Sequence, residues 1–300
     1  MIDYRLLVCH DAPYSGRYFF VYDNKRRWVP SGAHMNAYGL KWDILETVTK
    51  GYLATYELMA PLPHPALEYN PSMSVSDIHD FIGNQLKGKG IEFGAASSPF
   101  PVALDSEVEY ADFYDHTKES SPYYNNVYYA EREYVTAKHL TGLETMHTVG
   151  NESLDFVIAC HVIEHVKNPL LAIEAAWNKL KPGGKLVLLV PHRDLTFDKN
   201  RELTTLEHLI MDYKRPLPER DFLHFIDFYE KAFVVPDARQ KALAEFNSSF
   251  SDIHYHVWNE NSFLEMANYF SGNIKPWSNI TYYPHLLNDQ ANEFYFIFEK

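Results

Sequence analysis

Histidine and carboxylate side chains gather just after the apolar stretches of this chain. His161 directly follows the apolar run Leu154–Cys160, and Glu164 and His165 come shortly after it. His208 lies in a more polar region farther along. Imidazoles and carboxylates take up and release protons, and a positioned one assists attack by a hydroxyl group. We therefore predict that His161 and His208 contact a substrate.

Metal binding is another use of histidines. His254 and His256 would project from one face of a strand, because alternate side chains of a strand share a face. Metal sites normally have three or four protein ligands, and the sequence shows no firm third one. We therefore expect no bound metal ion.

The elements that would position these residues alternate between strands and helices. Apolar runs predict strands at 91–94, 108–112, 154–160 and 185–190. A capping box at Ser74–Asp77 predicts a helix to Leu86, with Gly88 and Gly90 ending it. The pair Asn168-Pro169 predicts the start of a second helix. This alternation predicts an α/β fold with a parallel sheet.

Residues 1–72 are expected to form a small N-terminal segment or module. Tyr18–Tyr22 and Arg27–Val29 predict a hairpin around Asp23 and Asn24, and Trp42–Val48 predicts a short helix. Proline-rich residues 60–71 would link this segment to a main domain of residues 73–300. Within that domain we expect a helical insertion at about 192–256, a helix at 259–269, and closing strands at 280–283 and 293–299.

Composition and charge exclude several classes of protein. A chain of 300 residues suits one domain with an extension, or two small domains. The net charge of −13 argues against nucleic acid as the main partner. Two cysteines fit a reducing compartment rather than a disulfide framework. No leader segment is recognisable, and the apolar runs are shorter than the ~20 residues of a membrane span. We expect a cytoplasmic protein without a membrane span.

A loop of small residues, Gly94–Ser98, follows the first of these strands, so its backbone can approach a ligand closely. Glu92 precedes the loop and Asp112 ends the next strand. Ligands of open α/β sheets bind beyond the carboxyl ends of the strands, where a carboxylate can accept two hydrogen bonds. The loop fails the G-x-G-x-x-G pattern of nicotinamide binding. Its Ala and Ser residues are not expected to adopt a positive φ.

Three segments in this order and spacing, Gly90–Pro99, Leu154–His165 and Leu180–Pro191, resemble the core of class I S-adenosylmethionine-dependent methyltransferases. The resemblance implies a Rossmann-like, mostly parallel sheet of seven strands, with S-adenosylmethionine as cofactor and methyl transfer as the reaction. It further implies a set of cofactor contacts at Glu92, Gly94, Ala95, Ser97, Asp112, Glu144, Cys160 and His165.

Within this set, the resemblance gives Glu92 to the methionine part of the cofactor and Asp112 to the ribose hydroxyls. Two features depart from the family pattern. Its loop usually carries two or three glycines, where this chain keeps only Gly94. The acidic residue expected after the third strand is missing, and Glu144 is the nearest substitute.

A closer resemblance, over roughly residues 80–300, is to a bacterial subfamily that accompanies surface-polysaccharide glycosyltransferases. It is carried by the segments 93–101, 153–161, 195–208 and 254–258. Members usually have Asp where this chain has His192. The resemblance implies O-methylation of a sugar or other glycan-linked group, with a small-molecule or glycan acceptor and a glycosyltransferase as partner. Two alternatives stay open: a small-molecule or N-methyltransferase, and a non-catalytic, methyltransferase-like scaffold or glycan-binding protein.

Overall fold

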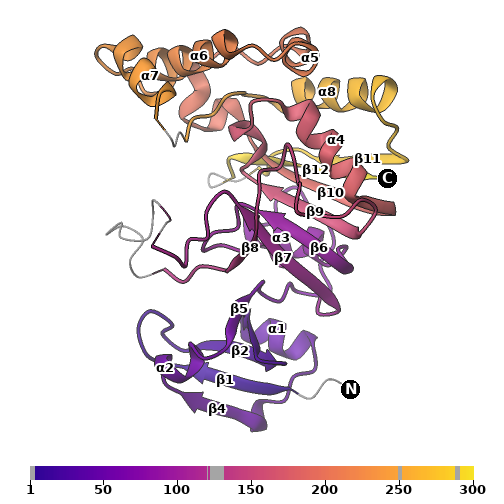
Figure 1. Ribbon diagram of the computed structural model, residues 1–300. Coiled ribbons are helices and arrows are strands. Elements are labelled where there is room, and N and C mark those ends of the chain that lie inside the picture. Colours follow the sequence, from indigo (N-terminus) through magenta and orange to yellow (C-terminus); the bar gives the residue numbers. More distant parts are fainter. Residues whose placement is uncertain (1–3, 120, 122–131, 249–251, 288–290) are drawn as a thin grey trace. The chain divides into compact units, whose positions relative to one another are not determined.

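The computed structural model describes residues 4–119, 121, 132–248, 252–287 and 291–300. The contacts between residues group the chain into two compact units, residues 1–140 (unit 1) and residues 141–300 (unit 2). Figure 1 shows unit 1 in indigo to magenta and unit 2 in rose to yellow.

Unit 1 begins with a five-stranded sheet in the order β4-β1-β2-β3-β5. Its strands are β1 (Arg5–Cys9), β2 (Arg17–Tyr22), β3 (Lys25–Val29), β4 (Leu45–Val48) and β5 (Glu57–Met59). The predicted hairpin is confirmed as β2 and β3, which pair antiparallel. Asp23 and Asn24 join them with φ of 45° and 57°. Two left-handed residues match the right-handed twist of the strands, and Asp and Asn tolerate that conformation best among residues other than glycine.

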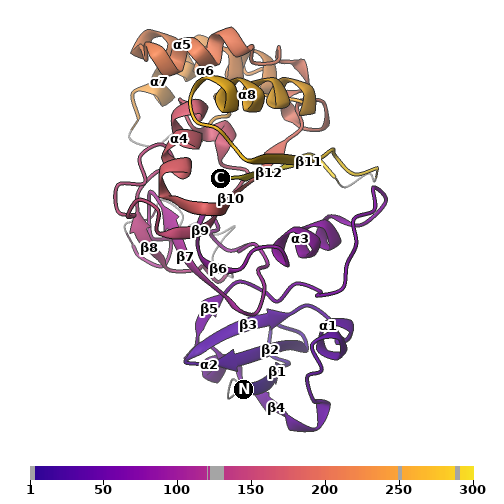
Figure 2. The same cartoon turned by 90° about the vertical axis from the view of Figure 1, so that its right-hand side faces the viewer.

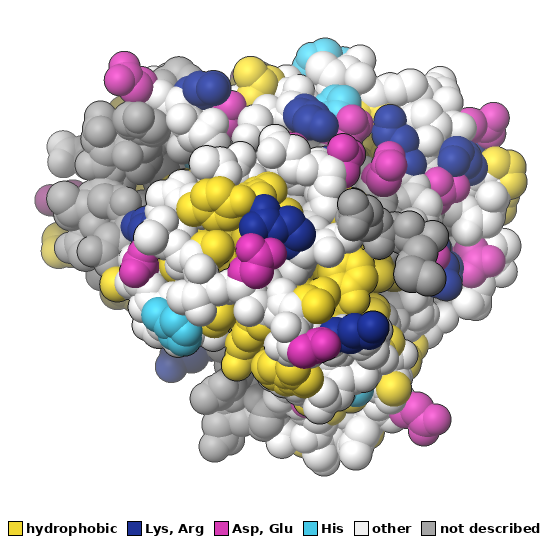
Figure 3. Space-filling model, turned by 90° about the horizontal axis from the view of Figure 1, so that it is seen from below, with side chains coloured by type: hydrophobic (Ala, Val, Ile, Leu, Met, Phe, Trp, Pro, Cys, Tyr) yellow, Lys and Arg dark blue, Asp and Glu magenta, His cyan; other side chains and the backbone are white. Residues whose placement is uncertain are grey.

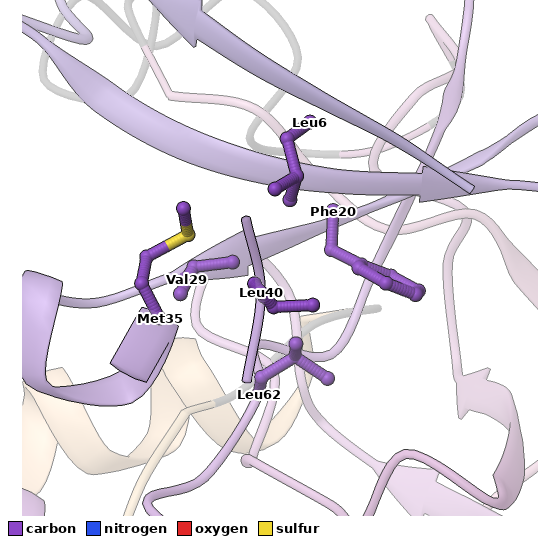
Figure 4. Packing of buried hydrophobic residues seen from close by; sticks show 6 residues of the cluster. All are labelled: Leu6, Phe20, Val29, Met35, Leu40 and Leu62. Atoms are coloured by element: carbon purple, nitrogen blue, oxygen red, sulfur yellow. The ribbon is translucent and has the colours of Figure 1, made fainter. Parts of the chain in front are cut away.

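A hydrophobic core lies on one side of this sheet, where α1 (Gly32–Ala37) packs against β3. Figure 4 shows the side chains that meet there from strands, helix and loops: Leu6, Phe20, Val29, Met35, Leu40 and Leu62. Burying a large apolar side chain contributes roughly 1.5–3 kcal/mol, so this cluster accounts for much of the cohesion of the N-terminal sheet.

The predicted helix at 42–48 is wrong. Trp42–Ile44 forms only a single 3-10 turn, and Leu45–Val48 is the edge strand β4, parallel to β1. Thr47 and Val48 are β-branched and pair with Val8 and Cys9, so a ladder with β1 replaces the local helix. The short helix α2 (Lys50–Leu53) follows, with Thr49 as its N-cap.

The rest of unit 1 contains α3 (Val75–Gly83) and the parallel strands β6 (Gly88–Phe93), β7 (Ser106–Asp112) and β8 (Ala137–Leu140). The capping box of Ser74 and Asp77 is confirmed. The predicted helix end is wrong, because Gly88 and Gly90 lie inside β6 and the helix stops at Gly83. A Cβ at Gly83 would clash with the carbonyl oxygen of Pro101, so glycine permits this close approach.

One buried arginine ties the N-terminal sheet to the loop that precedes β7. The guanidinium of Arg27, on β3, is 1% exposed. It donates to the carbonyl oxygens of Ala60 (2.7 Å), Pro61 (3.1 Å) and Ala103 (3.2 Å), and to that of Val102. Because a buried cation is costly unless its donors are satisfied, these bonds hold Val102 and Ala103 of the loop next to Ala60 and Pro61.

Unit 2 supplies β9 (Leu154–Cys160), β10 (Leu180–Pro191), β11 (Asn279–Tyr283) and β12 (Glu293–Glu299). β9 and β10 are parallel, and β12 runs antiparallel to both β10 and β11. The helix α4 (Pro169–Lys179) starts at the predicted cap Asn168 and packs on β10. The helix α8 (Glu260–Asn273) starts at Asn259 with a capping box. Figures 1 and 2 both place α8 on the same side of β11 and β12.

The insertion of unit 2 is helical, as predicted. It consists of α5 (Leu206–Lys214), α6 (Pro218–Asp227), a π-helical turn at Phe228–Ala232 and α7 (Ala238–Phe246). α5 packs on α4 and α8, and α6 packs on α7. A 3-10 turn at Ile163–His165 follows β9. Two more 3-10 turns, at Arg193–Leu195 and Phe197–Asn200, precede the helices of the insertion.

The strands of the second sheet have the order β11-β12-β10-β9-β6-β7-β8. Seven strands, mostly parallel, confirm the predicted α/β, Rossmann-like fold. In the part of the chain that the structure describes, every helix is too short or too polar to cross a membrane.

The anchoring role of Arg27 predicts a large effect of Arg27→Met on the free energy of unfolding. The methionine keeps the apolar stem but leaves four buried carbonyl groups without their donor, at about 1–3 kcal/mol for each one that finds no water. We expect a loss of at least about 3 kcal/mol in urea unfolding. The control is Arg17→Met on β2, an exposed arginine that lies over the Trp28 ring, with an expected loss below about 1 kcal/mol. Equal losses for the two variants would contradict the anchoring role.

Candidate functional site

The small-residue loop follows β6 in unit 1, as predicted. Gly94 donates its N–H to the carbonyl of Ala111 on β7 (3.1 Å) and has φ of +69°. Ala96 has φ of +47°, so the expectation that only glycine adopts a positive φ here is wrong. The carbonyl of Ala96 accepts from Val135 N (3.0 Å), and this tertiary bond offsets the cost of a left-handed alanine.

Glu92, on β6, is fully buried and binds the backbone just beyond the far end of this loop. Both of its carboxyl oxygens lie within hydrogen-bonding distance of the Phe100 N–H, at 2.9 and 3.1 Å. Burial raises the pKa of Glu92 to about 8, and the hydrogen bond from Phe100 opposes that shift only in part. Glu92 therefore braces the far end of the loop, and its contact with the methionine part of a cofactor stays a prediction.

Asp112 ends β7 beside the start of the loop, because Phe93 and Ala111 are paired in the β6–β7 ladder. One carboxylate oxygen accepts from the neighbouring Phe113 N (2.7 Å), and the other lies 3.2 Å from His116 Nε2. The side chain is 20% exposed, so its remaining acceptor capacity is open to a ligand. Of the other predicted contacts of unit 1, Ala95 is buried and Ser97 is partly exposed.

The end of β9 in unit 2 carries a histidine with two carboxylate neighbours. His161 follows Cys160 with a left-handed φ of +51°. Its Nε2 lies 2.6 Å from Glu293 Oε2, and its Nδ1 lies 3.8 Å from Glu164 Oε1. Burial alone would lower the pKa of His161, but the hydrogen bond to Glu293 and the negative charges of Glu164 and Glu293 together outweigh it, so the pKa is raised. The ring is 36% exposed, so this imidazole can meet a substrate.

Glu164 connects His161 with His165. Its Oε1 lies 3.8 Å from nitrogen atoms of both rings, and neither carboxylate oxygen has a hydrogen-bond partner although both are buried. Its backbone carbonyl accepts from Tyr255 N at 2.7 Å. His165 Nδ1 lies 3.0 Å from the carbonyl oxygen of Ile253, which fixes its ring. Buried carboxylate oxygens without donors in a pocket of imidazoles mark a place for a proton or a ligand donor.

The other predicted residues of unit 2 occupy different places. Glu144 Oε1 accepts from Asn168 N (2.8 Å) and thereby supports the start of α4, so its contact with adenine stays a prediction. His208 belongs to a separate cluster with Asp212, His224 and His256. The prediction that His254 and His256 share a face is wrong, because residues 252–257 are not a strand and His254 pairs with Asp198 instead (2.5 Å).

Two partners of the histidines were missed in the sequence. Glu293 binds His161 from 132 residues away, at the start of β12. Asp198 binds His254 from 56 residues away, in a 3-10 turn. Asp198 lies in the segment 195–208 that carries the closer resemblance, and Glu293 lies in a predicted closing strand, but neither segment indicates which histidine its carboxylate meets, so only the fold forms these pairs.

A family model described as a methyltransferase domain matches residues 68–267. The chain belongs to this methyltransferase family. As a member, the methyltransferase is an enzyme that uses S-adenosylmethionine as its cofactor. No curated protein matches it.

Solved structures with a similar fold are only distantly similar to the methyltransferase. The CurJ carbon methyltransferase has 12% identity and a TM-score of 0.38, over 75% of this chain and 52% of that chain. A possible histamine N-methyltransferase from Thermotoga maritima has 13% identity and a TM-score of 0.36, over 70% and 81%. A methyltransferase from Methanosarcina mazei has 15% identity and a TM-score of 0.39, over 76% and 98%. The chain thus spans about half the length of the first of these proteins.

The residues of unit 1 fit the cofactor of this family. Gly94 is exposed, has no Cβ and allows a close approach to the loop backbone. The partly exposed carboxylate of Asp112, next to this glycine, is acceptor-only and suits a pair of hydroxyl donors. The contacts of Gly94 and Asp112 with S-adenosylmethionine stay a prediction.

Asp112→Ala is predicted to weaken S-adenosylmethionine binding by about 10- to 100-fold, since it removes hydrogen bonds to a charged acceptor worth about 1.5–3 kcal/mol. Isothermal titration of the wild type and the variant measures the dissociation constants. The control is Asp105→Ala, which removes an exposed carboxylate just before β7. Unchanged affinity in Asp112→Ala would remove this residue from the cofactor site.

The buried Glu92 predicts a pH-dependent stability. Its pKa is about 8 in the folded chain and 4.5 in the reference state, so the folded chain holds more protons between these values. By linkage the free energy of unfolding falls as pH rises from 4.5 to 8, by on the order of 5 kcal/mol at most. Glu92→Gln should remove this fall in urea unfolding at pH 5, 7 and 9, whereas Glu107→Gln, an exposed glutamate of β7, should keep it. Parallel profiles for Glu92→Gln and wild type would contradict the assignment.

Proposed function

We propose that this methyltransferase transfers a methyl group to the oxygen of a sugar or glycan-linked group in bacterial polysaccharide assembly. The resemblance over residues 80–300 suggests the acceptor class. The observation that best supports an oxygen acceptor is the His161–Glu293 pair, with a nitrogen–oxygen distance of 2.6 Å. A hydroxyl group is a weak nucleophile, and an imidazole oriented by a carboxylate is suited to take its proton.

In this proposal the two nitrogen atoms of His161 have different tasks. Nε2–H donates to Glu293 and fixes the ring, so Nδ1 is the atom that accepts the proton of the acceptor hydroxyl. Glu293, 4% exposed, stabilises the imidazolium that results. S-adenosylmethionine supplies an electrophilic methyl group when it is bound. The residues of unit 1 would hold that cofactor, with Asp112 on the ribose.

We further propose that residues 1–72 are a module apart from the methyltransferase domain of residues 73–300, and that a glycosyltransferase is the partner. The family match begins only at residue 68, and the N-terminal sheet has a core of its own. Figure 3 shows one face of the molecule, seen from below, where hydrophobic side chains lie at the surface beside pairs of opposite charge. Trp42 is 44% exposed and Tyr52 is 41% exposed, and exposed aromatic side chains are typical of binding surfaces.

The acceptor is tested by incubating the enzyme with labelled S-adenosylmethionine and separate panels of nucleotide sugars, glycan fragments and amine metabolites. Methyl transfer to a sugar hydroxyl, identified by the chemical shift of the new methyl group, is the expected result. Transfer only to amines would replace the proposal by N-methylation of a small molecule.

The His161–Glu293 pair predicts a pH profile. Because the pair raises the pKa of His161, the neutral ring and hence kcat/KM should increase through a pKa above 6.5. Glu293→Gln should move that limb to lower pH, and His161→Gln should lower kcat by about 10²- to 10⁴-fold. The control is His147→Gln, an exposed histidine of unit 2 that bonds Thr141. A profile that Glu293→Gln leaves unmoved would exclude His161 as the base.

A further inference from the structure

Four side chains of unit 2 converge in a cluster that the proposed methyl transfer does not use. His208 and Asp212 lie on the same face of α5, His224 lies on α6, and His256 lies in the segment just before Trp258. One ligand-type atom from each residue lies within 4.8 Å of all the others. His208 Nε2 is 2.9 Å from Asp212 Oδ2 and 3.3 Å from His224 Nε2.

Backbone carbonyls fix the proton positions of two of the rings. His224 Nδ1 lies 2.7 Å from the carbonyl oxygen of Tyr255, and His256 Nε2 lies 3.1 Å from that of Lys167. A carbonyl oxygen only accepts, so each of these nitrogen atoms carries the hydrogen. The lone pairs are therefore on His224 Nε2 and His256 Nδ1. Metal-binding histidines are oriented in this way by their second nitrogen.

The cluster has more acceptors than donors. His224 Nε2, His256 Nδ1 and Asp212 Oδ2 all offer lone pairs, whereas His208 Nε2 can present only one N–H to these near neighbours. His256 is 0% exposed, and its Nδ1 has no hydrogen-bond partner. Asp212 Oδ2 is also buried without a well-aligned donor, although His208 Nε2 lies 2.9 Å away and Arg220 Nε pairs with the other oxygen, Oδ1, at 3.3 Å. Burying such groups unsatisfied is costly, and one cation at the centre would satisfy all of them.

We propose that His208, Asp212, His224 and His256 bind a divalent transition-metal ion of the Zn²⁺ type. Three imidazoles and one carboxylate are a ligand set for zinc and its neighbours in the periodic table, whereas Mg²⁺ and Ca²⁺ prefer oxygen ligands. Zinc binds nitrogen and oxygen at about 2.0–2.2 Å, so its ligands stand roughly 3.3 Å apart, which is close to the shorter distances in this cluster.

The proposed ion has a structural role, since four protein ligands complete a closed tetrahedral site. It joins the successive helices α5 and α6 to the segment 252–258, which lies farther along the sequence. The backbone N–H of His256 and that of Tyr255 both lie close to the carbonyl oxygen of Glu164, at 3.4 and 2.7 Å. The ion would therefore hold the insertion in place next to Glu164. This inference goes beyond the proposed function and holds whatever the acceptor is.

The test uses untagged full-length protein that has been stripped with a chelator and then titrated with Zn²⁺ or Co²⁺ alone. We expect one equivalent of Zn²⁺ by elemental analysis, the intense visible bands of tetrahedral Co²⁺, and a melting temperature that rises with metal. His208→Gln and Asp212→Asn should weaken binding by at least about 10- to 100-fold. His208 is 36% exposed, so its replacement is compatible with folding, which circular dichroism checks.

The matched control is His285→Gln, because His285 is also 36% exposed and pairs with a carboxylate, that of Glu260. It should keep both the metal and the visible bands. The absence of Zn²⁺ and Co²⁺ binding by folded wild type would overturn the proposal and favour a water molecule as the occupant. Binding that survives both His208→Gln and Asp212→Asn, or that only His285→Gln abolishes, would overturn it as well.

Discussion

The functional part of unit 2 depends on the ion pairs and hydrogen bonds that the guanidinium of Arg201 forms. The guanidinium is buried, and it forms ion pairs with Asp198 (2.8 Å) and Asp227 (2.7 Å). It also donates to the carbonyl oxygens of His254 (2.8 Å) and Tyr255 (3.3 Å). A buried arginine must satisfy its donors, and doing so here fixes the irregular segment that carries the histidines. A planar fork of five donors suits this task better than a lysine would.

This irregular segment in turn fixes residues elsewhere in unit 2 through the hydrogen bonds of its backbone. The carbonyl of Tyr255 also accepts from His224, and the N–H of Tyr255 binds the carbonyl of Glu164. One stretch of backbone without regular structure thus connects the end of β9 to the helical insertion. In unit 1, Arg27 acts in a similar way, since it binds the carbonyls of Val102 and Ala103 in the loop that Glu92 braces at Phe100, as well as those of Ala60 and Pro61.

The same hydrogen bonds decide what each histidine can do. His161 has a carboxylate at Nε2, which raises its pKa and makes the ring suited to exchanging a proton. His224 has a carbonyl at Nδ1 and another imidazole at Nε2, and burial lowers its pKa to about 4. A ring that stays neutral cannot serve as an acid near neutral pH, but it is ready to bind a metal ion. Identical side chains therefore acquire different chemistry from their neighbours.

The sequence by itself determined the strand and helix order, because apolar runs and helix caps act over a few residues. Leu154–Cys160, the cap at Asn168 and the capping box at Ser74 all appear as predicted. Prediction from the sequence failed where a distant partner outweighs local preference. Residues 45–48 pair with β1 as strand β4 instead of forming a helix. Ala96 takes a positive φ, which its hydrogen bond with Val135 supports.

The candidate site, too, could be predicted only in part from the sequence. The motifs located His161, Glu164 and Asp112, because their places follow directly from the ends of strands. The sequence could not pair His161 with Glu293, nor separate His256 from His254 and bring it to His224. Those groupings arise only when chain segments far apart in sequence pack together, since burial obliges each polar group to find a partner. Residue types and local pattern thus set the family and the elements, whereas the tertiary structure alone decided which imidazoles meet which carboxylates.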